Sequence, residues 1–403
     1  MLIHNPNAVL APYPAELRQI MSIERARESR AWLSGWRPLI AGTTPLWSLP
    51  GLAARLGVGE LSVKDESVRS PLGSFKALGA PVALLRLVLR RFPERGFMPA
   101  RLMAGDYRRE LGGFTVISAT DGNHGRALAA AAQALGCRCV IVLHARVSTE
   151  REQAIAAYGA EIVRIAGNYD ASVAEAARLA TENGWQVVSD TSYAGYEDIP
   201  RDVMQGYAVL AAEAVEQAAG GRFTHVFLQG GVGGLAAGVA SYLWELQGEA
   251  RPVFVIVEPR QADCLFQSAR TGEPVSATGA VDSVMAGLAC GETSPLAWRF
   301  LRPCADWFMT IEDAEAVAAM RVLAVGGEHD LPIVAGESGV AGLAGLMALC
   351  REPALAERAG LDAASRVLVI NTEGDTAPSV YDSLVGESGR SVRDRQARRV
   401  RKR

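Results

Sequence analysis

The stretch FTVISATDGNHGRALAAAAQAL, residues 114–135, carries the pattern that decides the fold. Its first five residues are mostly apolar and β-branched and predict a strand, residues 121–125 form a glycine turn, and the alanine-rich residues 126–135 predict a helix. The order continues with predicted strands at 139–143, 161–165 and 185–189 and predicted helices at 149–158 and 170–182. Strands that alternate with helices of this length predict a parallel sheet covered on both faces, and therefore an α/β fold.

A second part of the chain repeats this pattern, with predicted strands at 224–229, 253–258 and 366–371 and a predicted helix at 235–246. Because 403 residues exceed the usual size of one domain and no linker separates the two parts, we expect two intertwined lobes. Each lobe should hold a mostly parallel sheet flanked by helices. The expected boundaries are 1–113 for the first part of a large lobe, 114–190 for an inserted small lobe, 191–388 for the second part of the large lobe, and 389–403 for a basic tail.

The basic tail holds seven arginines, one lysine and one aspartate. Such a run can bind nucleic acid, but a solvated terminus is the more frequent outcome, so we expect a disordered, non-catalytic tail and no nucleic-acid partner. No apolar run approaches the roughly 18 to 20 residues that cross a bilayer, and the first residues do not resemble a secretory signal. We therefore expect a cytoplasmic protein without membrane contact. The six cysteines lack metal-ligand spacing, which predicts reduced thiols and no structural metal.

Lys76 is notable because only three of the 41 basic side chains are lysines. It lies in the stretch Ser74-Phe75-Lys76-Ala77-Leu78-Gly79-Ala80, just before an apolar run. A desolvated lysine can lose its proton and attack a carbonyl carbon, whereas an arginine stays charged. Lys76 is therefore a candidate for covalent catalysis. The alternatives are a solvated lysine or a phosphate contact.

A glycine-rich turn follows the predicted strand that ends at Gln229 and precedes a helix. It consists of Gly230, Gly231, Val232, Gly233 and Gly234. Backbone N–H groups in such a turn can point into one concavity, and the helix start adds a partial positive charge, so the turn predicts an anion site that fits a phosphate. The sequence is neither a P-loop nor a dinucleotide fingerprint. Tight packing alone is the alternative interpretation.

The turn from Thr120 to Gly125 is a second candidate site, because it also follows a strand and precedes a helix. Asn123 and His124 can fix a flat polar ligand. Asp121 would cap the following helix if it had no other role. Helix capping explains Asp121 well, but it explains Asn123 and His124 poorly.

Together, a reactive lysine, a polar turn, a phosphate cradle and Thr372 at the end of the last strand are the parts needed to hold pyridoxal phosphate (PLP). Their order resembles the tryptophan-synthase-beta-like, or fold type II, family of PLP enzymes, which includes threonine and serine dehydratases. Leu78 stands where that family usually has arginine, and Asp121 stands where the dehydratases have serine or glycine. Both departures resemble the diaminopropionate ammonia-lyase branch. Further motifs agree with that branch between about Pro38 and Tyr381, among them Lys64-Asp65-Glu66-Ser67, Met204-Gln205-Gly206-Tyr207, Gly336-Glu337-Ser338-Gly339 and Asn371-Thr372-Glu373-Gly374-Asp375-Thr376.

The resemblance implies a role for each candidate residue. Lys76 would form the Schiff base, with Phe75 beside the cofactor, Asn123 would bind the phenolic oxygen, and Thr372 would face the pyridine nitrogen. The cofactor phosphate would lie on the turn Gly230 to Gly234. Glu373 and Asp375 would alter the protonation of the ring if they turned inward. The resemblance also implies a homodimer, in which an N-terminal segment with Trp32, Trp36 and Trp47 would help to cover the interface.

Two aspartates suit 2,3-diaminopropionate as the substrate, because its second ammonium needs a carboxylate in a desolvated site. Asp121 meets this need, and Asp190, at the end of a predicted strand, is the second candidate. We expect PLP-dependent α,β-elimination that yields pyruvate and two molecules of ammonia. The resemblance suggests Asp190 as the base for the L isomer and Asp121 for the D isomer.

Two other functions are compatible with the motifs. A PLP-dependent dehydratase of serine, threonine or hydroxyaspartate would keep every cofactor contact, although Asp121 and Leu78 count against it. A non-catalytic nucleotide- or amino-acid-binding protein would use Lys76 only as a phosphate contact.

Four further residues receive structural rather than catalytic interpretations. Glu258 resembles part of a cation site of related racemases, but Cys264 stands where a carboxylate is expected, so no metal is predicted there. Cys264 and Cys290 can pair in this branch, yet two thiols are expected in a reducing cell. His225, inside an apolar strand, is expected to be a core residue with satisfied hydrogen bonds.

Overall fold

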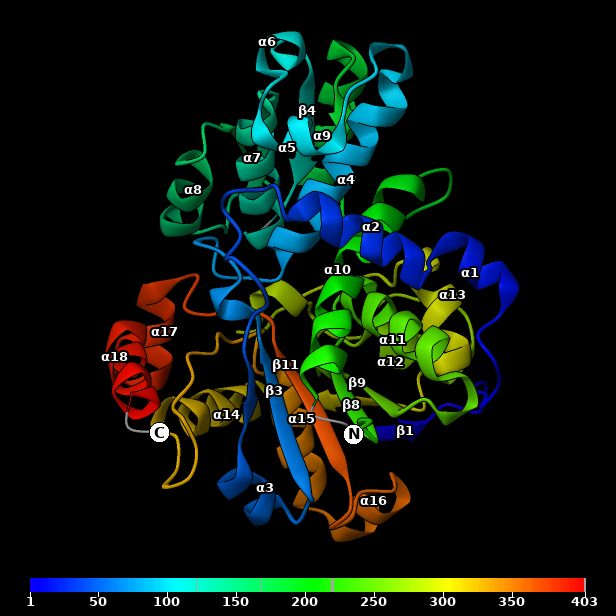
Figure 1. The fold of residues 1–403 in the computed structure, drawn as a ribbon, viewed down its shortest axis with the longest axis vertical. Coiled ribbons are helices and arrows are strands. Elements are labelled where there is room, and N and C mark those ends of the chain that lie inside the picture. Colours follow the sequence, from blue (N-terminus) through cyan, green and yellow to red (C-terminus); the bar gives the residue numbers. More distant parts are fainter. Residues whose placement is uncertain (121, 168, 219–220, 402–403) are drawn as a thin grey trace.

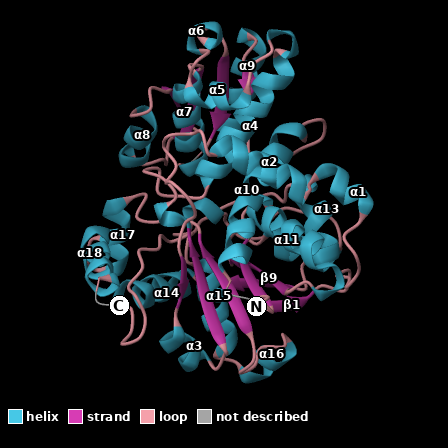
Figure 2. Cartoon of the chain, viewed as in Figure 1, coloured by secondary structure: helices cyan, strands magenta, loops and turns pink. Residues whose placement is uncertain are grey.

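Two sheets with helices around them organise the chain (Figures 1 and 2). The computed structural model describes residues 1–120, 122–167, 169–218 and 221–401. The predicted α/β fold with two mostly parallel sheets is confirmed.

The large sheet has seven strands in the order β1-β10-β9-β8-β11-β3-β2. The edge strands β1 and β2 run antiparallel to β10 and β3, and the inner strands are parallel. The inner strands are almost fully buried, as expected for a parallel sheet covered on both faces. The strands are β1 (Leu2–His4), β2 (Leu46–Ser48), β3 (Glu60–Asp65), β8 (His225–Gln229), β9 (Val253–Pro259), β10 (Trp307–Ile311) and β11 (Arg366–Asn371).

The small sheet has four parallel strands in the order β6-β5-β4-β7. These are β4 (Thr115–Ala119), β5 (Arg138–His144), β6 (Glu161–Ile165) and β7 (Gln186–Val187). The predicted strand at 185–189 is thus shorter than expected. The reason is that the Ser189 N–H donates to the Tyr196 hydroxyl at 2.9 Å instead of to a neighbouring strand, so the chain turns away from the sheet.

The helices cover both sheets and the space between them (Figure 1). In chain order they are α1 (Ala15–Ile20), α2 (Ile23–Leu33), α3 (Pro50–Leu56), α4 (Lys76–Arg91), α5 (Pro99–Ala104), α6 (Arg108–Leu111), α7 (Asn123–Leu135), α8 (Thr149–Ala156), α9 (Tyr169–Asn183), α10 (Asp198–Gln217), α11 (Gly234–Gln247), α12 (Cys264–Thr271), α13 (Pro295–Cys304), α14 (Asp313–Val325), α15 (Ala341–Cys350), α16 (Pro353–Arg358), α17 (Pro378–Val385) and α18 (Gly389–Val400). Four short 3-10 helices complete the list: η1 (Glu66–Val68), η2 (Pro93–Arg95), η3 (Gly248–Ala250) and η4 (Ala286–Leu288). Within the described ranges, no helix combines the length and apolarity that a membrane span needs.

The strands of the small sheet all lie inside the predicted small lobe, 114–190. Helices α4, α5 and α6, which precede residue 114, lie beside that sheet in Figure 1, and α4 and α5 pack against α7. Burial of the apolar side of α4, for example Leu84 and Val88, explains this position. The lobe boundary at residue 114 stays a prediction.

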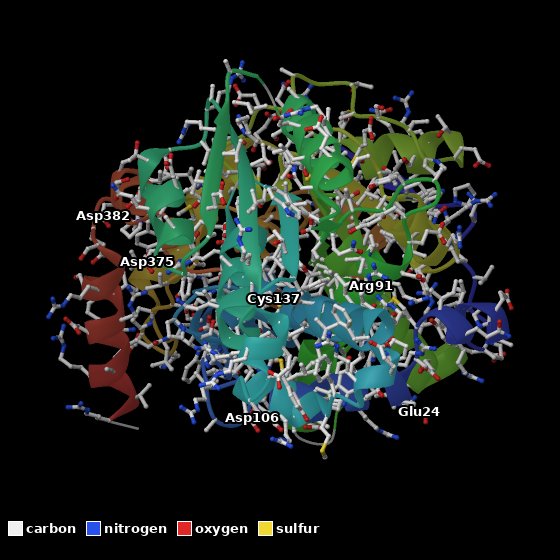
Figure 3. All side chains as sticks on the ribbon, turned by 90° about the horizontal axis from the view of Figure 1, so that it is seen from above. Glu24, Arg91, Asp106, Cys137, Asp375 and Asp382 are labelled. Atoms are coloured by element: carbon white, nitrogen blue, oxygen red, sulfur yellow. The ribbon has the colours of Figure 1, made fainter. Side chains whose placement is uncertain are left out.

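The predicted disordered tail is helical over Gly389–Val400, and this helix, α18, is docked on the protein. The Arg393 guanidinium binds both oxygens of Asp375, at 2.7 and 2.8 Å, and Val392 is fully buried. Figure 3 shows the labelled Asp375 close to the red helix. The composition suggested a solvated tail because its charge is high. It did not reveal that Asp375 and several backbone carbonyls would accept hydrogen bonds from these arginines.

The N-terminal tryptophans pack within the chain. Trp36 is 1% exposed, the Trp32 ring lies 4.9 Å from the Arg86 guanidinium, and the Trp47 indole donates to Asp65 at 3.1 Å. These contacts give the tryptophans a structural role within one subunit.

Candidate active site

A cavity of about 750 Å³ is lined by both lobes. Its walls come from the segments that follow the carboxyl ends of β4, β7, β8 and β11. Ligand crevices of parallel sheets form at these ends. The cavity is therefore the candidate active site, and its lining includes Phe75, Lys76, Asn123, Asp190, Gly230, Gly231, Val232, Gly234 and Thr372.

A close crossing of α4 and α10 positions Lys76, the first residue of α4. A Cβ at Gly79 would lie 2.5 Å from the Tyr207 ring, and a Cβ at Gly206 would lie 2.2 Å from the Leu78 carbonyl oxygen. Only glycines allow the two backbones to approach this closely. The crossing brings the Tyr207 ring within 4.6 Å of the Phe75 ring, and the Lys76 amine lies 5.6 Å from the Tyr207 ring centre.

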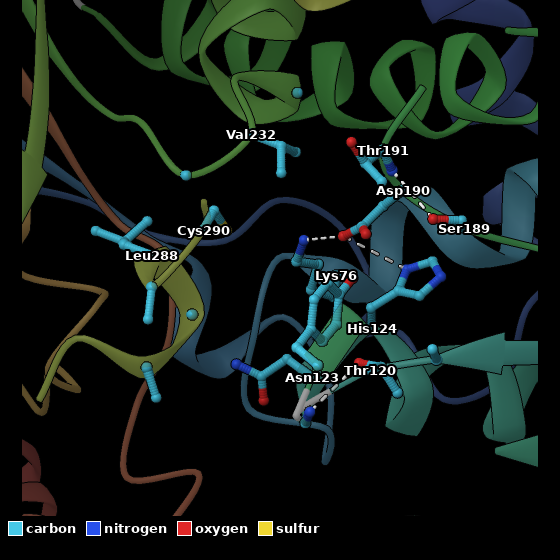
Figure 4. A pocket seen from close by; sticks show the side chains of 18 of the residues that line it. Lys76, Thr120, Asn123, His124, Ser189, Asp190, Thr191, Val232, Leu288 and Cys290 are labelled. Carbon is cyan, nitrogen blue, oxygen red and sulfur yellow. Dashed lines mark hydrogen bonds and ion pairs between the residues drawn. The ribbon is translucent and has the colours of Figure 1, made fainter. Parts of the chain in front are cut away.

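Lys76 and His124 converge on Asp190 (Figure 4). The Lys76 amine donates a hydrogen bond to Asp190 Oδ2, and His124 Nδ1 lies 3.7 Å from the same oxygen. His124 Nε2 lies 2.9 Å from the Val188 carbonyl oxygen, which can only accept, so Nε2 carries a hydrogen. The lysine predicted from its rarity therefore meets one of the two predicted carboxylates.

The ion pair decides the charges of both groups. Burial acts to lower the pKa of Lys76, but the Asp190 carboxylate outweighs it and raises the pKa above its ordinary value. Burial acts to raise the pKa of Asp190, but Lys76 and then His124 outweigh it and hold this pKa well below its usual range. In this state of the site Lys76 is therefore an ammonium, because Asp190 stabilises the charged form.

The glycine turn adopts a conformation that leaves a helix N-terminus open to the cavity. Gly231 and Gly233 have φ values of 61° and 100°, in the left-handed region that favours glycine. Helix α11 begins at Gly234 with no side-chain cap, so its first N–H groups are available to an anion. Gly230 and Gly233 also pack tightly, since a Cβ would lie 2.5 Å from Glu258 Cγ and 2.9 Å from Ala297 Cβ, respectively.

Asn123 lies at the start of α7, with its side chain in contact with the segment after β11. Its Nδ2 donates to Glu373 Oε2, and Glu373 Oε1 accepts a hydrogen bond of 3.1 Å from the Ser338 N–H. Thr372 is 3% exposed and lines the cavity. Of the two acidic neighbours of Thr372, Glu373 faces the cavity, whereas Asp375 turns away to Arg393.

Asp121, the other predicted catalytic aspartate, lies outside the described residues. Its neighbours Thr120 and Gly122 line the cavity. The role of Asp121 stays a prediction.

Several cavity residues were not predicted as site residues from the sequence. They are Tyr207, Glu373, Arg151 and Ser338. Tyr207 and Ser338 belong to the motifs Met204-Gln205-Gly206-Tyr207 and Gly336-Glu337-Ser338-Gly339. The sequence alone does not show that these motifs lie at a cavity. Nothing in the local sequence of Arg151 distinguishes it from other surface arginines.

The residues with structural interpretations behave differently from the cavity residues. His225 is 4% exposed, and its Nε2 hydrogen bonds to the Ala359 carbonyl at 3.0 Å, so its assignment to the core is confirmed. Glu258 accepts hydrogen bonds from the Leu265 and Phe266 N–H groups, at 2.9 and 2.7 Å, at the start of α12. Cys264 is a buried thiol 3.4 Å from the Gly231 carbonyl oxygen. The described residues contain no cluster of three or more potential metal ligands.

These groups fit pyridoxal phosphate. An uncapped helix N-terminus with glycine backbone suits the phosphate, Lys76 offers an amine for the aldehyde, and Asn123 offers an amide to a ring oxygen. The cavity holds all three kinds of group.

Comparisons with known proteins agree with this geometry. The chain matches the family of pyridoxal-phosphate dependent enzymes over residues 38–373. It is 40% identical to the diaminopropionate ammonia-lyase of Escherichia coli K12 over 374 residues, which cover 91% of this chain and 92% of that protein. The corresponding enzyme of Salmonella typhimurium LT2 is 39% identical, with 87% of this chain and 89% of that protein covered.

Solved structures extend the similarity to three dimensions. The holo form of Escherichia coli diaminopropionate ammonia lyase has a TM-score of 0.85 and 38% identity, and 96% of each chain is covered. Its complex with an aminoacrylate-PLP azomethine reaction intermediate also has a TM-score of 0.85, with 38% identity and the same coverage. Threonine deaminase from Solanum lycopersicum, at 21% identity and a TM-score of 0.70 over 96% of this chain and 98% of that one, shares the fold. The chain therefore belongs to the family of pyridoxal-phosphate dependent enzymes.

Proposed function

We propose that this protein is a diaminopropionate ammonia-lyase, which eliminates ammonia from 2,3-diaminopropionate with pyridoxal phosphate as its cofactor. The products are pyruvate and two molecules of ammonia. The observation that carries the proposal is the direct contact of the Lys76 amine with the Asp190 carboxylate in the cavity. The similarity to diaminopropionate ammonia-lyases along nine-tenths of the chain supports the choice of substrate.

Lys76, Asn123, Thr372 and the turn Gly230 to Gly234 would hold the cofactor. When bound, pyridoxal phosphate supplies an aldehyde carbon for the substrate's 2-amino group and a ring that accepts the electrons of the C2–H bond. Phe75 is buried and packs beside Lys76, with its ring centre 5.1 Å from Nζ.

Asp190 is suited to act as a base. Its lowered pKa keeps it a carboxylate at neutral pH, and it can accept the proton from C2 of the substrate once the Lys76 ammonium no longer pairs with it, because that pair makes the carboxylate a weak base. The C3–N bond then breaks, and its electron pair leaves with ammonia. The released 2-aminoacrylate reacts with water to give pyruvate and the second ammonia. Before the reaction, the carboxylates of Asp190 and Asp121 would attract the substrate's ammonium groups.

We assign the two aspartates to the two isomers of the substrate, with Asp190 serving the L isomer and Asp121 the D isomer. The test is to measure pyruvate formation from each isomer with Asp190→Asn and Asp121→Asn. Each substitution should reduce turnover of its own isomer by about 10²- to 10⁴-fold, the usual contribution of a general acid or base, and affect the other isomer much less. Equal losses for both isomers would contradict this division of roles.

The same assay separates this function from a dehydratase. Diaminopropionate should give pyruvate at a kcat/KM well above those for serine, threonine and hydroxyaspartate. A preference for a hydroxy amino acid would identify the protein as a dehydratase instead.

We also propose that the protein works in the cytoplasm as a homodimer, with an amino acid as its small-molecule partner and without nucleic acid. The buried thiols Cys137, Cys139 and Cys264 suit a reducing compartment. Light scattering of the purified protein should give a mass close to twice 42.8 kDa. A mass of one subunit would contradict the dimer.

A further inference from the structure

Side chains of helix α8, in the small lobe, contact the large lobe at the rim of the cavity. Arg151 Nη2 lies 3.1 Å from Glu337 Oε1, and Glu337 belongs to the segment just before α15. The adjacent Glu150 accepts a 2.6 Å hydrogen bond from the Ser379 hydroxyl of α17. Figure 1 shows α8 above α17, consistent with this contact. Two neighbouring side chains of α8 therefore bridge to the other lobe.

Glu337 is a buried carboxyl with an unfavourable neighbour. Its side chain is 4% exposed, and burial, reinforced by the Glu373 carboxylate, raises its pKa to about 7. Arg151 is the described cation that opposes both effects. Without Arg151, the buried Glu337 carboxylate would lack a nearby cation, and burial would favour its protonated form.

The Glu373 carboxylate in turn fixes the side chain of Asn123. A carboxylate only accepts hydrogen bonds, so its contact with Asn123 must be made by the amide nitrogen. One hydrogen of that NH₂ group is used by Glu373, and the other is left for a second acceptor in the cavity. Glu373 Oε1 accepts from the Ser338 N–H, and Ser338 follows Glu337 in the chain, so the position of the Glu337 segment sets the position of the Glu373 carboxylate.

We propose that Arg151 is a positioning residue for the cofactor site: its pair with Glu337 closes α8 onto the large lobe and holds the segment whose Ser338 N–H fixes Glu373, so that Asn123 presents its second N–H to the cofactor's phenolic oxygen. The chain of contacts runs from Arg151 to Glu337, along the backbone to Ser338, and through Glu373 to Asn123. This inference rests on the proposed use of Asn123 as a cofactor ligand. It adds a residue from outside the predicted site, on a helix for which no role was predicted.

The test measures the affinity of the purified enzyme for pyridoxal phosphate, by the visible absorbance band after dialysis against known cofactor concentrations. Arg151→Gln should raise the Kd for the cofactor at least about tenfold at pH 8, where an ionised Glu337 would be buried without a partner. Arg151→Lys should restore part of the affinity because it restores the charge. The double variant Arg151→Gln with Glu337→Gln should bind the cofactor more tightly than Arg151→Gln alone, since no unpaired charge is left.

The pH dependence of the Kd distinguishes positioning from a general loss of structure. The defect of Arg151→Gln should shrink as the pH falls, because a protonated Glu337 is no longer a buried charge that lacks a partner. A matched control is Arg138→Gln, which removes an exposed ion pair with Glu161 on the same lobe, away from the cavity, and should leave the Kd unchanged.

An unchanged Kd in Arg151→Gln, or a double variant no better than the single one, would overturn the inference. Neither result depends on which substrate the enzyme uses. A wild-type enzyme that binds the cofactor but forms no pyruvate from diaminopropionate would instead contradict the proposed function alone.

Discussion

At the scale of single residues, charge pairing dominates the cavity. Lys76 is an ammonium because Asp190 touches it, although a nucleophilic lysine must be neutral. The amine can become neutral once Asp190 is occupied by another cation or once a proton passes between the two groups. The bond between Lys76 and the cofactor aldehyde therefore requires that a proton first leave the Lys76 ammonium.

Glu258 provides a test, at the residue scale, of how burial changes the pKa of a carboxyl group. Burial raises its pKa to about 8, whereas a carboxyl of this kind in the unfolded chain has a pKa of about 4.3. A carboxyl with a raised pKa stabilises the fold fully below about pH 4.3, and this contribution is lost as the pH rises to about 8. Glu258→Gln should lower the free energy of unfolding by about 1 to 3 kcal/mol at pH 5, because the two N–H groups bond to different oxygens of Glu258 and Gln would place an NH₂ donor against one of them.

The measurement for Glu258 is urea unfolding of wild type and Glu258→Gln at several pH values between 5 and 9. The difference between the two proteins should narrow as the pH rises. Two parallel stability curves would show that Glu258 does not bind a proton in this range.

At the scale of elements, the crossing of α4 and α10 places the cavity residues. Gly206→Ala introduces a Cβ that would lie 2.2 Å from a backbone oxygen of α4, so the helices must separate. We expect a loss of about 1 to 3 kcal/mol in the free energy of unfolding, although alanine favours a helix by about 1 kcal/mol over glycine. Turnover should fall as well, because Tyr207 and Lys76 move apart.

Gly113→Ala is the matched control for this crossing, because a Cβ at Gly113 meets no atom within 4 Å. The measurement compares the thermal unfolding and the turnover of Gly206→Ala with those of Gly113→Ala. A Gly206→Ala enzyme as stable and active as the control would contradict the role of the crossing.

Helix α18 supplies a second prediction at this scale. Val392 is fully buried and Val400 is 45% exposed on the same helix. Val392→Ala should lower the free energy of unfolding by about 1 to 3 kcal/mol, and Val400→Ala should change it by less than about 0.5 kcal/mol. If both substitutions change the free energy of unfolding equally and only slightly in chemical denaturation, the segment is the disordered tail that its composition suggests.

At the scale of the whole molecule, the sequence predicts local order better than contacts between distant segments. The strands at 161–165 and 366–371 match β6 and β11 residue for residue, because alternating strand and helix patterns are local properties. Lys76, Asn123, Asp190 and four residues of the glycine turn, Gly230, Gly231, Val232 and Gly234, line one cavity, as the order of the motifs suggested. The roles of these residues stay predictions.

The contacts that the sequence could not reveal join segments far apart in the chain. Arg151 meets Glu337, and Arg393 meets Asp375, only after the lobes and the terminal helix have packed. Composition made both arginines appear to be surface charges. The fold supplies their partners, and no local pattern encodes which carboxylate an arginine will meet.

The central claim, that Lys76 bonds covalently to pyridoxal phosphate, can be tested directly because the chain has only two other lysines, Lys64 and Lys402. Borohydride reduction of the purified holoenzyme, followed by peptide mass spectrometry, locates the attached cofactor. The account predicts a phosphopyridoxyl group on the peptide that contains Lys76 and on no other peptide. A label on Lys64, on Lys402 or on the N-terminal amine, or no label at all, would contradict it.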